Sequence, residues 1–118
     1  MTCPVVCVRT DQTMGAVVLT VSGPLTSVEH IYTLHHALDH LPDGYSLIIE
    51  LDDMTTLSTA GLAGMRNLAG TASGMGVQLV LVSQSIDVRA NLILSDLDSL
   101  APVLNNLAQA RQVVCLAA

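Results

Sequence analysis

The chain has 118 residues with four Lys plus Arg, all of them Arg, ten acidic residues and a net charge of −6. This length suits one domain with its own core, and a hydrophobic content of 51% excludes a disordered chain. The acidic balance argues against binding to nucleic-acid phosphates or to anionic membranes, and the absence of Phe and Trp argues against base stacking.

The apolar pattern and the cysteines also indicate the cellular compartment of the protein. No apolar run approaches the ~20 residues that span a bilayer, so we expect no membrane insertion. The N-terminus lacks a basic start followed by an apolar block, so no signal peptide is expected. The three cysteines, Cys3, Cys7 and Cys115, are interpreted as reduced thiols of a cytoplasmic protein.

Two strands are predicted at the start of the chain. Val5–Arg9 and Ala16–Val21 are rich in β-branched residues, and the turn residues Asp11–Gly15 separate them. Such a short connection predicts an antiparallel hairpin. Ser22–Pro24 is expected to break the second strand.

A helix and a buried strand are expected next. Thr26 and Glu29 have the spacing of a capping box, and apolar residues follow at helical intervals until Pro42. Ser46–Leu51 is nearly all apolar, which is typical of a strand flanked by other strands.

The second half of the chain repeats this alternation. A helix is predicted from near Thr59 to the glycines at 74 and 76, and a strand at Val77–Val82. Ser85 is placed to cap a helix that carries Val88, Leu92 and either Ile93 or Leu94 in its apolar stripe.

The last predicted elements are short. Asp96–Ser99 is expected to be a loop, and Leu100–Leu104 an edge strand because it contains Pro102. Asn106–Arg111 is predicted to be helical, and the state of Val113–Ala118 stays open.

This order of elements predicts an α/β fold. Strands that alternate with helices pair in parallel through right-handed crossovers. We therefore expect a mixed, mainly parallel sheet of four to five strands with an N-terminal antiparallel hairpin. A chain this short cannot cover both faces of the sheet fully, so the helices are expected to pack mostly on one face.

Two adjacent hydroxyl residues, Ser58 and Thr59, fall where a predicted helix begins. The free N–H groups and positive pole of a helix N-terminus accommodate a phosphate. Either residue can equally be a simple N-cap, which is the commoner role of such residues. A phosphoryl group there would alter what docks on the surface without unfolding the helix.

Metal and catalytic sites are not expected. His36 and His40 are four residues apart, a spacing that can hold a metal, but no third ligand accompanies them. The chain has no Lys for a Walker loop and no G-x-S-x-G nucleophile elbow. We therefore expect a protein that is not an enzyme and has no cofactor.

Four motifs resemble those of STAS domains, the anti-sigma factor antagonists. Leu47–Leu62 resembles the family's central block, in which Asp-Ser-Ser/Thr-Gly-Leu opens a helix. Ser85–Arg89 resembles its S-P-x-V-R helix start, and Leu97–Val103 its G-L-D-x-L-F-P-V. Ser22–Thr26 stands for its x-G-E-L-D. Together the resemblance covers about Val5 to Arg111.

The resemblance implies a STAS fold, with residues 1–118 forming one domain, and a switching function. Family members are small cytoplasmic proteins that bind an anti-sigma factor, often a serine kinase, and so release a sigma factor. The kinase phosphorylates a hydroxyl residue of the central motif, and a phosphatase restores it. The corresponding position is Thr59, with Ser58 as the alternative. Ser58, Ala60 and Thr26 replace the family's Asp, second hydroxyl residue and Asp.

The predicted partner-binding surface combines the start of the central helix, its outer face and the loop before the first helix. It consists of Gly23, Pro24, Leu25, Thr26, Ser58, Thr59, Ala60, Gly61, Leu62 and Arg66. Two other functions stay open. One is a STAS module that binds constitutively within a larger assembly, for example as a transporter accessory; the other is binding of a small ligand or nucleotide. Homodimerisation through exposed aliphatic residues is also left open.

Overall fold

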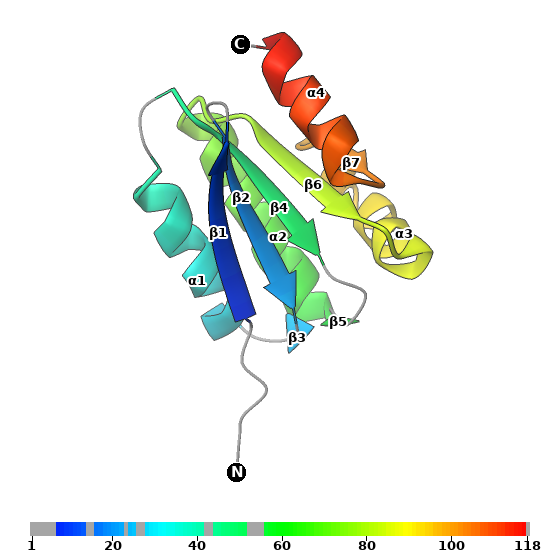
Figure 1. Cartoon of the computed structure of the whole chain (residues 1–118). Coiled ribbons are helices and arrows are strands. Elements are labelled where there is room, and N and C mark those ends of the chain that lie inside the picture. Colours follow the sequence, from blue (N-terminus) through cyan, green and yellow to red (C-terminus); the bar gives the residue numbers. More distant parts are fainter. Residues whose placement is uncertain are drawn as a thin grey trace.

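A computed structural model describes residues 7–13, 16–22, 24–25, 28–41, 44–51 and 56–117. Its main feature is a five-stranded sheet with the order β1-β2-β4-β6-β7 (Figure 1). The strands are β1 (Cys7–Thr13), β2 (Ala16–Ser22), β4 (Ser46–Leu51), β6 (Leu79–Ser83) and β7 (Val103–Leu104).

The sheet is mixed and mainly parallel, as predicted. β1 pairs antiparallel with β2, whereas β2, β4, β6 and β7 are parallel to one another. The predicted bounds of the first strand are wrong, because Asp11 and Gln12, expected in a turn, pair with Val18 and Val17 of β2. Residues 5 and 6 of that predicted strand lie outside the described residues.

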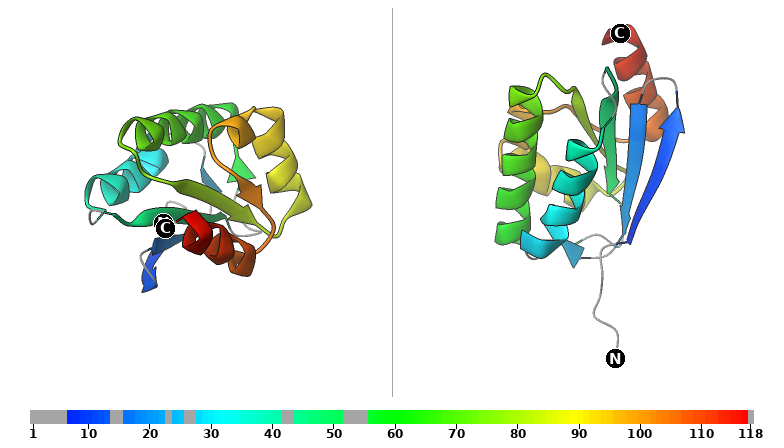
Figure 2. Two further views of the ribbon diagram at one scale, coloured as in Figure 1. Left: turned by 90° about the horizontal axis from the view of Figure 1, so that it is seen from above. Right: turned by 90° about the vertical axis from the view of Figure 1, so that its left-hand side faces the viewer.

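Helices cover both faces of the sheet (Figure 2). On the first face lie α1 (Val28–Asp39), α2 (Thr59–Gly74) and α3 (Ile86–Leu94). On the opposite face lies α4 (Leu107–Ala117), which continues past the predicted end at Arg111. The helices therefore pack mostly on one face, as expected.

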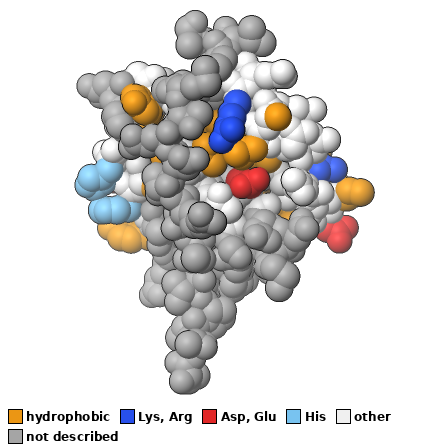
Figure 3. Space-filling model, viewed as in Figure 1, with side chains coloured by type: hydrophobic (Ala, Val, Ile, Leu, Met, Phe, Trp, Pro, Cys, Tyr) orange, Lys and Arg blue, Asp and Glu red, His pale blue; other side chains and the backbone are white. Residues whose placement is uncertain are grey.

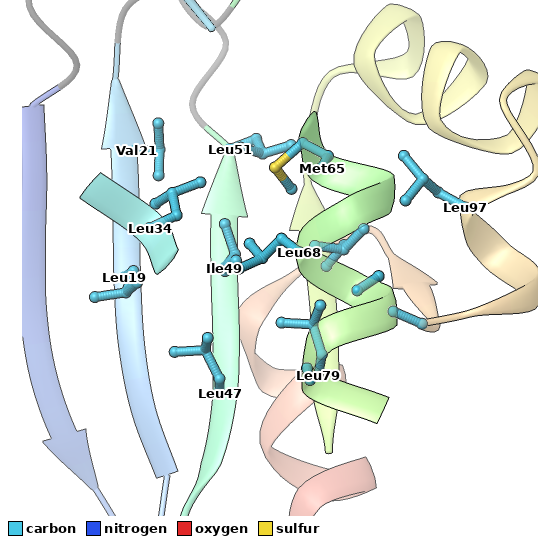
Figure 4. Close-up of a cluster of buried hydrophobic side chains, with 14 of the residues drawn as sticks. Leu19, Val21, Leu34, Leu47, Ile49, Leu51, Met65, Leu68, Leu79 and Leu97 are labelled. Atoms are coloured by element: carbon cyan, nitrogen blue, oxygen red, sulfur yellow. The ribbon is translucent and has the colours of Figure 1, made fainter. Parts of the chain in front are cut away.

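The core follows the alternation of side chains along the strands. Leu19, Leu47 and Ile49 are fully buried on the face that also receives Met65 and Leu68 of α2 (Figure 4). On the other face a smaller cluster joins strand residues to Ala110 of α4; its buried members are Ala16, Val18, Ile48, Val80, Val82 and Ala110. Burial on both faces explains why β4 and β6 are almost entirely apolar.

A second, two-stranded sheet was not predicted. β3 (Pro24–Leu25) pairs in parallel with β5 (Thr56–Leu57). Pro24 was expected to break a strand, but proline is compatible with the first position of a short edge strand. The predicted capping residue Thr26 lies outside the described residues.

Near the C-terminus the structure differs from the predicted bounds in detail. The strand expected at 77–82 begins at Leu79, and the expected loop contains the short 3-10 helix η1 (Leu97–Ser99). Asp96 precedes η1 with a φ of 63°, in the left-handed region. The edge strand is reduced to Val103–Leu104, directly after Pro102.

Candidate partner-binding and phosphorylation site

The carboxyl ends of β4 and β6 lie at the same edge of the sheet, and α2 and α3 begin there (Figure 1). At this edge Leu25 of β3 pairs with Leu57 of β5, and Ser58 follows Leu57 directly. The structure thereby brings the backbone of Pro24 and Leu25 beside the start of α2. The other two predicted members of that segment, at positions 23 and 26, lie outside the described residues.

Ser58 is the N-cap of α2. Its backbone is extended, with φ −86° and ψ 173°, and its Oγ accepts a hydrogen bond of 3.0 Å from the backbone N–H of Gly61. Its carbonyl accepts from the N–H of Leu62 at 2.8 Å. Of the two hydroxyl residues that sequence reasoning left open as caps, Ser58 is therefore the one that caps the helix.

Thr59 is the first residue of α2, and its side chain is exposed. Within the described part of the chain, its hydroxyl has no hydrogen-bond partner. The first turn of α2 carries no acidic residue. The Thr59 hydroxyl therefore lies at the positive end of a 16-residue helix.

The remaining predicted contact residues of α2 differ in exposure. Ala60 and Arg66 are on the surface, Leu62 is half-buried against the core, and Gly61 is buried. The guanidinium of Arg66 donates a 3.1 Å hydrogen bond to the carbonyl of Ser95, just after α3. Arg66 therefore joins the exposed face of α2 to the end of α3.

The start of α3 is built like that of α2. The Oγ of Ser85 accepts from the N–H of Val88 at 3.3 Å, which confirms Ser85 as the cap. The Oγ of buried Ser83 accepts from the N–H of Ser85 at 3.1 Å, and the Arg89 guanidinium donates to the Ser83 carbonyl at 2.7 Å. These bonds fix the position of α3 against the end of β6.

Sequence reasoning missed the exposed side of α3. Ile93 and Leu94 were considered for the apolar stripe that packs on the core, yet both are exposed, as is Ile86. Only Val88 and Leu92 of this helix are buried. The available signal was that α3 carries aliphatic residues around more of its circumference than one buried stripe requires.

His36 of α1 and His40, which directly follows this helix, are in contact. The Nδ1 of His40 lies 2.9 Å from the carbonyl oxygen of His36, and their ring centroids are 4.3 Å apart. Among the residues that the structure describes, no three His, Cys, Asp or Glu side chains are grouped to hold a metal ion. Likewise, no described helix is both long and apolar enough to cross a membrane.

Comparison with known proteins shows the family. The family model described as "STAS domain" matches residues 8–110, so the chain belongs to the STAS domain family. Among solved structures, the NMR structure of the protein TM1081 aligns with a TM-score of 0.68 and 22% identity. That alignment covers 89% of this chain and 86% of the other, and supports the same fold. No curated protein matches the chain with significance.

Proposed function

We propose that this STAS domain is an anti-sigma factor antagonist that binds a kinase-type anti-sigma factor and is released when Thr59 is phosphorylated. STAS domains in general occur in anti-sigma factor antagonists and related modules. The observation that carries the proposal is the exposed Thr59 hydroxyl at the first position of α2. In this proposal the chain is not an enzyme: it is the substrate of the kinase, and of a phosphatase that reverses the step, in the cytoplasm.

The local structure favours Thr59 over Ser58 as the phosphate acceptor. Ser58 is half-buried and its Oγ already accepts from the N–H of Gly61, so a kinase would have to displace this bond to reach it. The Thr59 side chain is exposed and makes no such bond. A kinase could therefore reach Thr59 without opening the first turn of α2.

A phosphate on Thr59 would be compatible with the fold. It adds about −1.5 to −2 charges and three acceptor oxygens at the positive end of the helix. The first turn has no carboxylate to repel it. The stability cost is therefore small, and the main effect falls on a partner docked at this edge, through charge repulsion and loss of close contact.

The partner-binding surface that we propose combines the predicted segments that the structure brings together. Thr59, Ala60 and Arg66 supply exposed side chains, and the β3–β5 pair supplies adjacent backbone. Gly61 and Leu62 lie beneath this surface and support it, because Gly61 is buried and Leu62 packs against the core.

The test has two parts. Incubation with the cognate kinase and ATP should add one phosphate by intact mass, and this phosphate should be lost in Thr59→Ala and kept in Thr59→Ser. Thr59→Asp should weaken partner binding in calorimetry at least about tenfold. Asn67→Asp is a matched control, since it adds the same charge to an exposed position two turns along α2. A phosphate on Ser58, or binding that ignores Thr59→Asp, would refute the switch and favour a constitutive module.

A further inference from the structure

The helix α3 carries aliphatic side chains on two opposite sides. Val88 and Leu92 are buried, whereas Ile86, Ile93 and Leu94 are 73%, 50% and 84% exposed. Helical periodicity places these three residues and exposed Ala90 on one side, away from the core. We call Ile86, Ala90, Ile93 and Leu94 the outer face of α3.

Carboxylates lie next to this face or follow it in the chain. Helical periodicity places Asp87 beside Leu94, and Asp96 and Asp98 come directly after α3. All three are exposed, and within the described residues none of them forms an ion pair. The two nearby arginines donate hydrogen bonds to backbone carbonyl groups instead. Arg89 is half-buried and donates to the carbonyl of Ser83, and Arg66 donates to that of Ser95.

Figure 3 shows this edge of the molecule from outside. Where α3 lies, hydrophobic, acidic and basic side chains are exposed next to one another. An aliphatic centre with accessible carboxylates around it is complementary to a surface that is apolar in the middle and basic at its rim.

From this complementarity we infer that the outer face of α3 binds a basic amphipathic helix of a partner protein. The apolar side of that helix packs on Ile86, Ile93 and Leu94, and its Lys or Arg side chains pair with the bordering carboxylates. A second copy of this chain is disfavoured because it would bring the same carboxylates together, in a chain of net charge −6. An anionic membrane is disfavoured for the same reason.

The geometry sets the size of this contact. α3 has nine residues, which corresponds to about 13 Å of helix, so the partner contributes two to three turns. This is smaller than a stable interface of about 1,000 Å² requires, so the contact serves as one part of a larger one. The hydrogen bond from Arg66 to the Ser95 carbonyl joins α2 to the end of α3, so α2 is the neighbouring element from which a larger contact can extend. The inference does not depend on phosphorylation of Thr59.

The experiment uses the full chain labelled with ¹⁵N and two synthetic amphipathic helical peptides that share Leu positions but carry either Lys or Glu around them. The Lys peptide should give saturable amide shifts over residues 86–94, and the Glu peptide should bind at least about tenfold more weakly. Ile86→Asn with Leu94→Asn should weaken the Lys peptide at least about tenfold. Asp87→Asn with Asp96→Asn should reduce its affinity and its salt dependence. Met75→Asn, at an exposed position after α2, is the control and should change nothing.

Several results would overturn the inference. These are equal binding of both peptides, shifts that avoid α3, or a dimer in sedimentation that Leu94→Asn abolishes, since that would assign the face to a second copy. Preferential co-sedimentation with phosphatidylserine vesicles would assign it to a membrane. Circular dichroism checks that each variant is folded. Thr59→Asp should bind the Lys peptide like the original chain, so a failure here is distinct from a failure of the proposed switch.

Discussion

Replacing Ser58 by alanine should destabilise the domain through one identifiable hydrogen bond. The variant loses the acceptor for the N–H of Gly61, a bond of 3.0 Å, but keeps the backbone bond from Leu62 to the Ser58 carbonyl. Loss of an N-cap typically costs about 0.5–2 kcal/mol. Because Gly61 is buried, water replaces the bond poorly, and we expect a loss of about 1–2 kcal/mol in the free energy of unfolding.

Urea unfolding followed by circular dichroism measures this loss, and a thermal scan should show a fall of about 3–8 °C in the midpoint. Ser58→Asp keeps a capping oxygen and adds a negative charge at the helix N-terminus, so it should match or exceed the original stability. Thr59→Ala removes an exposed hydroxyl and should stay within about 0.5 kcal/mol. The reasoning fails if Ser58→Asp is as unstable as Ser58→Ala, or if Thr59→Ala costs as much.

Four further substitutions test the packing and the backbone in the same unfolding assay. Leu68→Ala, at a fully buried position of α2, should lower the free energy of unfolding by about 2–5 kcal/mol. Leu94→Ala, at an exposed position, should lower it by less than about 0.5 kcal/mol. Similar losses for the two variants would contradict the assigned burial. Asp96→Gly should raise the free energy of unfolding by about 0.5 kcal/mol, because glycine adopts the left-handed φ of 63° without strain. A lower free energy of unfolding would refute the strain at Asp96. Arg89→Ala should cost about 1 kcal/mol by removing the bond to Ser83, while an unchanged midpoint would show that bond to be of no consequence.

The elements that sequence reasoning predicted well have strong local signals. Ser46–Leu51 is an uninterrupted apolar run, and its predicted bounds agree with β4. Ser58 and Ser85 each precede helical spacing, and both are caps in the structure. The start of α2 therefore required only local chemistry, together with a motif resemblance that indicated which hydroxyl to examine.

The features that were missed depend on contacts between distant segments. A two-residue strand has no periodicity, so the pairing of Leu25 with Leu57 has no sequence signal of its own. The strand through Asp11 contradicts its turn-like composition because β2 offers a continuous pairing partner. Ile93 and Leu94 are ordinary helix residues, and only the packing of Val88 and Leu92 decides that they face outward.

The pairing of β3 with β5 has a consequence for the kinetics of folding. Its two partners flank the crossover that runs through α1 and β4, so we expect them to meet only after β2 and β4 are in register. We expect this pair to be absent from the folding transition state, so that changes at Leu25 or Leu57 speed unfolding and leave refolding nearly unchanged. The edge that carries Thr59 would then be among the first parts of the domain to open, by a local opening that needs less free energy than global unfolding.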